Sequence, residues 1–314
     1  DNLLHQVVSN LPDGADCLAA AELCDHFSKI LIILRDDVRL SRFSQSLRII
    51  TNNIDIIEFP AWDCLPFDKN SPNQKLVGKR VRALSSLANP NSKKTIILST
   101  IGSVIQKIPN QDFIKNASKS IQSGQNISQR ELINFFENNG YMRTNTVRED
   151  SEYSLRGSIL DVYPPGEKNP VRIDFFGDVI DSLRVFDPIS QLSLHNINFI
   201  SFNAGNEIIL TDHSVELFRR NHREIFNEEY DKSLYGNISQ KIRTNGIEHY
   251  LSMFHESLAT IFDHIGDAHV ILDKEYLPVL DTKFDEINDF YIARKDDYNT
   301  EGKRFNLLSP QHLY

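Results

Sequence analysis

The segment SILDVYPPGEKNPVRIDFFGDVIDSLRVF, residues 158–186, contains three runs in which apolar and polar residues alternate. Alternation with a period of two is typical of strands that bury one face of a sheet. The sequences PPGEKNP and GD separate the runs, and both are rich in residues that form tight turns. The segment therefore predicts an antiparallel three-stranded meander, and similar patterning extends it to residues 153–187.

Strand parity assigns the residues of VRIDFF to two faces. Val171, Ile173 and Phe175 share the apolar face, whereas Arg172 and Phe176 lie with Asp174 on the opposite one. An aromatic ring beside an arginine on a solvated face is characteristic of protein-binding surfaces. The alternative is that Phe176 closes the hairpin over a neighbouring helix or domain, and the pattern alone leaves both interpretations open.

Continuous apolar runs on both sides of the meander predict strands that are buried on both faces. These runs are KILIIL (29–34), IDIIEF (54–59), TIILS (95–99) and HVILD (269–273). Helical patterns lie around them, and three residues are predicted to cap helices, namely Thr100, Ser128 and Asp212. Helices that alternate with buried strands indicate a parallel sheet with helices on its faces.

The predicted fold class is therefore α/β, with a parallel-sheet domain that is split in sequence by an inserted α+β domain containing an antiparallel sheet. The first segment of the parallel-sheet domain is expected at residues 1–117, the inserted domain at 118–204 and the second segment at 205–314. A length of 314 residues exceeds what one hydrophobic core usually supports, which agrees with more than one folding unit.

The composition excludes several classes of protein. With 34 Lys and Arg against 43 Asp and Glu, the chain carries a formal net charge of -9, which argues against a surface that coats nucleic acid throughout but allows a local basic patch. Cys17, Cys24 and Cys64 fit no zinc or disulfide spacing and predict the reduced thiols of a cytoplasmic protein. No signal peptide or membrane-spanning run is present, and the initial Asp suggests a fragment.

A search for catalytic, cofactor and metal sites gives no candidate. LPDGADCLAAAEL (11–23) stands where a phosphate loop would lie, but it lacks Gly-Lys-Ser/Thr, and Asp13 and Asp16 would repel phosphate. The histidines have no metal-ligand spacing, and His222 is expected in a helix core. We therefore expect no catalytic residue, cofactor or metal ion; a nucleotide hydrolase with an unusual loop is the disfavoured alternative.

The segment KLVGKRVRAL (75–84) predicts an amphipathic helix with a basic stripe. Lys75, Lys79 and Arg82 follow i, i+4, i+7 spacing and so share one face, and Arg80 is adjacent. The stripe could contact nucleic-acid phosphates, which makes a DNA-binding module the alternative function. An ordinary solvated helix face explains the same pattern and is favoured.

Five collinear segments together resemble the amino-terminal region of bacterial transcription-repair coupling factors and, more distantly, the excision-repair protein UvrB. They are FPAWDCLPFD (59–68), SPNQKLVGKRVRAL (71–84), SLRGSILDVYPPGEKNPVRIDFFGDVIDSLRVFD (154–187), GIEHY (246–250) and RFNLLSPQHLY (304–314). The resemblance implies a helicase-like domain with a degenerate phosphate loop and an inserted domain that binds UvrA. In the family, two arginines and a phenylalanine make that contact, and the matching residues are Arg156, Arg172 and Phe176.

The resemblance also implies what the chain lacks. The phosphate loop of UvrB is replaced by LPDGADCLAA, and KNSPNQ (69–74) stands where UvrB inserts its aromatic DNA-clamping hairpin. Family members bind RNA polymerase and translocate on DNA with ATP through regions that lie beyond this chain. The expected function is therefore non-catalytic recruitment of UvrA in a cytoplasmic protein that links stalled RNA polymerase to nucleotide excision repair.

Overall fold

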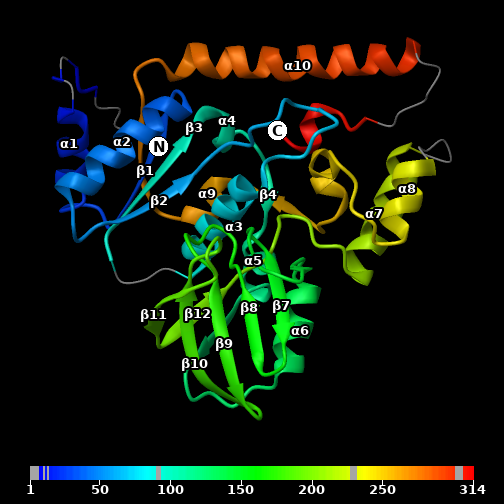
Figure 1. The fold of residues 1–314 in the computed structure, drawn as a ribbon. Coiled ribbons are helices and arrows are strands. Elements are labelled where there is room, and N and C mark those ends of the chain that lie inside the picture. The colour runs from blue at the N-terminus through cyan, green and yellow to red at the C-terminus, as the bar shows by residue number, and fades with distance from the viewer. Residues whose placement is uncertain (1–6, 10, 13, 90–92, 227–231, 301–306) are drawn as a thin grey trace.

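The computed structural model describes residues 7–9, 11–12, 14–89, 93–226, 232–300 and 307–314. A four-stranded parallel sheet has the order β14-β1-β3-β2 (Figure 1). Its strands are β1 (Lys29–Leu34), β2 (Asp55–Phe59), β3 (Thr95–Thr100) and β14 (His269–Leu272). The predicted α/β fold class with a parallel sheet is thus confirmed.

Helices cover both faces of this sheet (Figure 1). Successive side chains of β1 point to opposite faces, so Ile30 and Ile32 pack with α1 (Ala15–Leu23) and α2 (Asp37–Ile50). Leu31 and Ile33 pack on the other face, in a cluster to which five helices contribute. These five are α3 (Gln74–Ala88), α4 (Ile101–Val104), α5 (Gln111–Asn116), α9 (Ile261–Ile265) and α10 (Tyr276–Thr300).

The burial predicted for the apolar runs is correct at the centre of the sheet and wrong at its edges. Every residue of β3, and all of β1 except Lys29, is buried. In β2 only Phe59 is buried, and β14 has no buried residue. Within the described parts of the chain each of these two strands pairs with a single neighbour, which leaves one side open.

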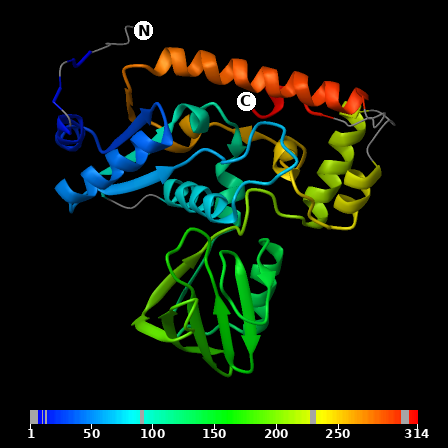
Figure 2. The same cartoon turned by 45° about the horizontal axis from the view of Figure 1, so that its top comes forward.

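Between β5 (Lys119–Gln122) and β12 (Phe199–Phe202) the chain forms a separate layered unit, which we call the antiparallel module, residues 119–202 (Figure 2). Its six-stranded sheet has the order β11-β10-β9-β8-β7-β6. The predicted meander corresponds to β8 (Ile159–Val162), β9 (Val171–Phe176) and β10 (Val179–Phe186). The prediction missed three strands, which are β6 (Met142–Arg143), β7 (Glu152–Arg156) and β11 (Ser193–Ile197).

One face of the six-stranded sheet is closed by α6 (Gln129–Asn138) together with the β5 and β12 pair. Leu132 and Phe136 of α6 pack against Ile173 and Phe175 of β9 in this core. Ser128 caps α6, as predicted, by accepting a hydrogen bond from the Glu131 amide at 3.2 Å. The sheet therefore buries its inner face in this core, whereas its other face is only partly exposed and buries Asp161 and Phe186.

The remaining elements complete the parallel-sheet part. They are β4 (Ile108–Pro109), α7 (Asp212–Phe226), α8 (Lys232–Ser239), the 3-10 helix η1 (Ile247–Met253), β13 (Leu258–Ala259) and the 3-10 helix η2 (Pro310–His312). In α7 the capping prediction for Asp212 is wrong, because the Ser214 amide donates to Thr211 Oγ1 at 3.1 Å. Asp212 instead forms an exposed ion pair with Lys241. Thr100 precedes α4 as predicted, but its hydroxyl contacts Ser103 Oγ.

The antiparallel module is joined tightly to the parallel-sheet part at α3. A Cβ on Gly78 would lie 2.6 Å from Asp150 Oδ2 and 2.7 Å from the Gly166 amide nitrogen. The Arg80 side chain is fully buried and pairs with Glu207 at 3.0 Å. Close backbone approach thus fixes the position of the module relative to α3, and the buried ion pair holds the segment that follows the module against the same helix.

Candidate functional site

Two hairpin turns place Arg156 and Phe176 at the same end of the six-stranded sheet. Gly157 and Gly177 begin these turns with φ of +62° and +63°, a conformation that glycine adopts without strain. Arg156 pairs with Ile159 across the first turn, and Phe176 pairs with Val179 across the second. Because β7 and β9 are both antiparallel to β8, their last residues lie at one end of the sheet.

The strand parity predicted for β9 is confirmed. Val171, Ile173 and Phe175 are buried, whereas Phe176 is 83% exposed. Register places further charged side chains on the same outer surface as Arg172. We call this surface the arginine face and define it by Arg156, Asp161, Arg172, Asp174, Phe176 and Arg184.

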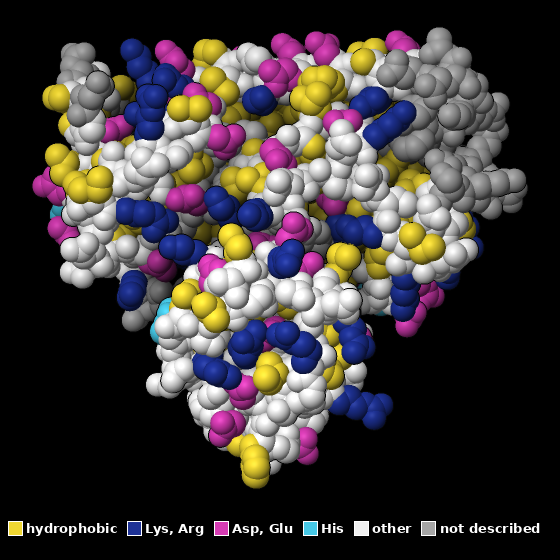
Figure 3. Space-filling model, in the orientation of Figure 1, with side chains coloured by type: hydrophobic (Ala, Val, Ile, Leu, Met, Phe, Trp, Pro, Cys, Tyr) yellow, Lys and Arg dark blue, Asp and Glu magenta, His cyan; other side chains and the backbone are white. Residues whose placement is uncertain are grey.

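Figure 3 views the molecule from the side of the arginine face. Lys and Arg side chains gather on the antiparallel module at the foot of the molecule, with acidic and hydrophobic side chains among them. A hydrophobic side chain forms the lowest point, where Figure 1 shows the tip of the β9 and β10 hairpin. The surface combines positive charge with an exposed apolar group.

A buried carboxylate organises the centre of the arginine face. Asp161 Oδ1 accepts from Arg172 Nε at 2.7 Å, and Asp161 Oδ2 accepts from Arg172 Nη2 at 2.9 Å. Arg156 Nη2 donates to the same Oδ2 at 2.5 Å. Only 1% of the Asp161 side chain is exposed, against 15% for Arg172 and 51% for Arg156.

Arg172 is held from two directions. Its guanidinium carbon lies 4.6 Å from the centre of the Phe186 ring, in addition to the two hydrogen bonds to Asp161. These hydrogen bonds raise the pKa of Arg172 above its ordinary value, so the group stays charged. Arg172 is thus fixed and largely covered, whereas Arg156 is the more accessible guanidinium.

Arg184 and Asp174 form a second ion pair on this face, which the alternation pattern did not predict. Arg184 Nε donates to Asp174 Oδ2 at 3.1 Å, and Ser182 Oγ donates to the same oxygen at 3.0 Å. Between Ile180 and Ser182 the register of β10 shifts by one residue. Counting parity from Val179 would therefore place Arg184 on the wrong face. The cross-strand pairing of Arg184 with Arg172 identifies its true side.

In α3, part of the predicted basic stripe is engaged in contacts within the chain. Lys75, Lys79 and Arg82 are exposed on α3. Arg82 Nη1 donates to the Gly166 carbonyl oxygen at 2.8 Å, and Arg82 also pairs with Glu167. The suggestion that adjacent Arg80 adds to the stripe is wrong, because its side chain is fully buried.

The segment tested as a phosphate loop leads into α1. Gly14 precedes the helix with φ of +83°, and the Asp16 carboxylate pairs with Arg39 of α2. Asp13 lies outside the described residues. Burial raises the pKa of the Cys17 thiol to about 11, which keeps it protonated at neutral pH. His222 lies on the buried face of α7, against Phe218 and Phe226, as predicted.

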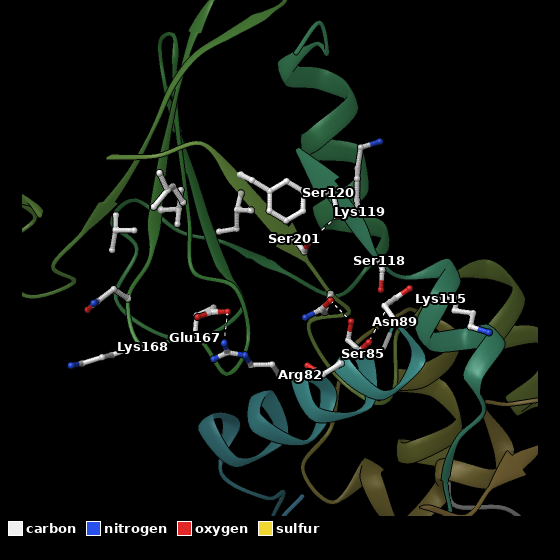
Figure 4. A pocket seen from close by; sticks show the side chains of 18 of the residues that line it. Arg82, Ser85, Asn89, Lys115, Ser118, Lys119, Ser120, Glu167, Lys168 and Ser201 are labelled. Carbon is white, nitrogen blue, oxygen red and sulfur yellow. Dashed lines mark hydrogen bonds and ion pairs between the residues drawn. The ribbon is translucent and has the colours of Figure 1, made fainter. Parts of the chain in front are cut away.

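A cleft of about 870 Å³ separates α3 from the edge of the antiparallel module (Figure 4). Its serine and asparagine groups are largely paired with one another, as Ser85 is with Asn203 at 2.6 Å and Ser120 with Ser201 at 2.8 Å. Figure 4 shows the amino groups of three rim lysines directed away from this polar centre, namely Lys115, Lys119 and Lys168. The cleft therefore presents no convergent set of free polar groups.

Within the described ranges of the chain, no three His, Cys, Asp or Glu side chains are grouped as metal ligands. None of the helices in those ranges is long and apolar enough to span a membrane.

Comparison with known proteins gives matches over nearly the whole chain. Residues 120–207 match the family model of the UvrB interaction domain. The transcription-repair-coupling factor of Haemophilus influenzae is 31% identical over 314 residues, which cover 99% of this chain and 27% of that protein. The proteins of the same name from Escherichia coli and Rickettsia bellii are each 28% identical, over 99% and 91% of this chain respectively.

The chain spans only about a quarter of the length of these relatives, 27% in the first two and 25% in the third. The family-model match begins in β5 and includes every residue of the arginine face. This chain is thus similar to transcription-repair-coupling factors along nearly its whole length, and its residues 120–207 match the UvrB interaction domain.

Proposed function

We propose that this chain recruits UvrA by protein association, without catalysis, and that the arginine face is the contact surface. The observation that carries the proposal is the exposure of Phe176, which is 83% exposed at a hairpin tip and lies on the same face of the sheet as Arg156 and Arg172. Aromatic rings and arginines are enriched at protein-binding surfaces, so their combination on one face favours a contact surface. The match of residues 120–207 to the UvrB interaction domain supports the same partner.

Each residue would have a distinct role in the contact. Phe176 would enter an apolar pocket on UvrA, because its ring has little apolar cover in the free chain. Arg156 would pair with an acidic side chain, since half of its side chain remains exposed while it contacts Asp161. Arg172 would offer the partner only Nη1, because Asp161 accepts from its Nε and Nη2 and the Phe186 ring lies against its guanidinium.

The proposal extends to the organisation and setting of the chain. Residues 1–117 and 205–314 would be the two segments of a UvrB-like scaffold that carries the inserted UvrA-binding domain, residues 118–204. The protein would act in the cytoplasm, in transcription-coupled nucleotide excision repair. Contact with RNA polymerase and ATP-driven translocation on DNA would belong to the portion of the relatives that this chain does not span.

Calorimetric titration of purified UvrA into this chain tests the proposal. Replacing Phe176 by Ala should weaken binding by about 2 kcal/mol or more, as expected for a central contact residue. Phe262 of α9 is 45% exposed outside the arginine face, so Phe262→Ala serves as the matched control and should bind like the parent. Equal affinity of the Phe176→Ala variant and the parent would refute the proposed surface.

DNA binding through Lys75, Lys79 and Arg82 is the weaker proposal. Arg82 already donates to the Gly166 carbonyl oxygen and pairs with Glu167 within the chain, which reduces the positive charge that the stripe offers to DNA. Binding to phosphates would weaken steeply with added salt. A titration against duplex DNA at low salt should therefore show no binding that depends on these three residues.

A further inference from the structure

We propose that Asp161 is the positioning residue of the arginine face, where its buried carboxylate aligns Arg156 and Arg172 to receive a carboxylate of the partner. This inference rests on the proposed function and adds to it the residue that positions the arginines for their acidic partner. Asp161 does not contact the partner in this arrangement. It acts through the two guanidinium groups that it holds.

The burial of Asp161 explains why it holds them firmly. Its side chain is 1% exposed, and its two oxygens accept three hydrogen bonds from Arg156 and Arg172. A buried carboxylate is strongly unfavourable unless it is paired and hydrogen-bonded. Two guanidinium groups would repel one another so close together, and the single negative charge between them offsets that repulsion.

The cross-strand register gives this arrangement its rigidity. Asp161 of β8 lies directly opposite Arg172 of β9, and Arg156 of β7 lies two residues beyond the Ser154 position that pairs with Asp161. The three side chains therefore project from adjacent strands of one sheet. The Phe186 ring supports Arg172 from its other side at 4.6 Å.

The trio of Arg156, Asp161 and Arg172 has a net charge of one positive unit. Among the described residues, Arg156 Nε and Nη1 and Arg172 Nη1 have no hydrogen-bond acceptor. These remaining donors suit one carboxylate, from an Asp or Glu side chain, that approaches from solvent. The exposed Phe176 ring favours a protein segment over a nucleic-acid phosphate, because the same surface also needs an apolar pocket.

This arrangement has a consequence for mutagenesis. Replacing Arg172 by Ala removes the bidentate partner and leaves the Asp161 charge only partly compensated, where it would repel an acidic partner. Part of the loss in Arg172→Ala should therefore come from Asp161 itself. Replacing Asp161 by Asn in that background removes the repulsion and should restore some affinity.

Titration of UvrA against four versions of this chain, each with all 314 residues, tests the inference. Asp161→Asn should raise Kd by about tenfold or more, because the two arginines lose their common anchor. Arg172→Ala should bind weakly, and the Asp161→Asn/Arg172→Ala double variant should bind at least about threefold more tightly than Arg172→Ala. The fourth protein is the parent.

Two more variants keep the test decisive. Asp68→Asn breaks a partly buried pair with Arg294 outside the arginine face and should bind like the parent. Arg172→Lys keeps the charge but cannot form the bidentate contact, so it should bind about tenfold more weakly than the parent if alignment matters. Melting temperature and circular dichroism verify that each variant is folded. If Asp161→Asn does not fold, Arg172→Lys alone tests the positioning role.

The outcomes separate the two proposals. If the parent binds UvrA while Asp161→Asn and Arg172→Lys bind equally well, the positioning role is wrong and the proposed function stands. Strictly additive losses in the double variant would likewise overturn the positioning role. If the parent does not bind UvrA, both proposals fall.

Discussion

Arg80 and Arg82 come from the same turn of α3 and have opposite surroundings. Arg82 is exposed, whereas Arg80 is buried between the Phe59 ring at 4.5 Å and the Trp62 ring at 5.5 Å. Arg80 also donates to the Pro60 carbonyl oxygen at 2.8 Å. Helical phase could have placed Arg80 on the apolar side, but its partner Glu207 is 127 residues away in sequence, beyond any local pattern.

Loss of Arg80 should strongly destabilise the chain. Arg80→Ala leaves Glu207 buried with only the Trp62 indole and its local surroundings to compensate its charge, which should cost about 3 to 5 kcal/mol. Arg82→Ala removes an exposed ion pair from the same helix and should cost less than about 1 kcal/mol. Urea unfolding of both variants measures the difference. Similar stabilities would contradict the structural role of the buried pair.

The residues of the proposed contact were only partly predictable. Strand alternation correctly placed Arg172 and Phe176 on the outer face, because β9 is regular. The role of Asp161 was missed, although the hairpin around PPGEKNP pairs Val162 with Val171 and so brings Asp161 opposite Arg172. An opposite-charge pair directly across two strands is a signal that the sequence contains once the register is known.

Among the secondary-structure elements, α3 is the one on which the two parts of the molecule meet. Gly78 lies against the turn that contains Gly166, and a Cβ on Gly166 would come within 2.7 Å of the Gly78 carbonyl oxygen. Asp150 Oδ2 accepts from the Gly166 amide at 2.9 Å. Contacts this close require the absence of a side chain on both glycines.

A methyl group at Gly78 should therefore disturb the junction. Gly78→Ala would force backbone atoms apart and should destabilise the chain by about 1 to 3 kcal/mol, despite the better helix propensity of Ala. Gly236 of α8 has open space around its Cβ position, so Gly236→Ala should be neutral or stabilising by up to about 1 kcal/mol. Chemical denaturation compares the two. A Gly78→Ala variant as stable as the parent would show that the junction can relax.

Elements with strong local patterns were predictable and those without them were not. KILIIL coincides with β1 because a central parallel strand is apolar throughout. The short strands β6 and β11 are mostly exposed and show no clear alternation. The long helix α10 was missed because it exposes much of its apolar surface, including Leu277, Phe284 and Ile292, so its amphipathic pattern is weak.

At the scale of the whole molecule, stability should depend on pH through its buried histidines. Burial lowers the pKa of His249 from 6.5 to about 4, and it lowers the pKa values of His255 and His264 as well. The unfolded chain therefore takes up protons on these groups at a higher pH than the folded chain does. The stability that these neutral histidines contribute should be fully present above about pH 6.5 and should be lost as the pH decreases toward 4.

Replacing His249 by Leu should reduce this dependence. His249 lies near Trp62 and Phe67, where an apolar side chain is compatible with its neighbours. The difference in unfolding free energy between about pH 7.5 and about pH 5 should become smaller in the variant, because one group no longer titrates. Urea unfolding at both pH values measures it. An unchanged difference would assign the pH dependence to other groups.

The pairing of β5 with β12 determines how the antiparallel module is attached. Lys119 lies opposite Phe202, so the chain enters and leaves the module at neighbouring points of one two-stranded ribbon. A unit with adjacent ends can be exchanged for another of similar entry geometry while the surrounding fold keeps its connections. The parallel-sheet part is thus a scaffold into which recognition domains of different specificity can be inserted at the β5 and β12 connection.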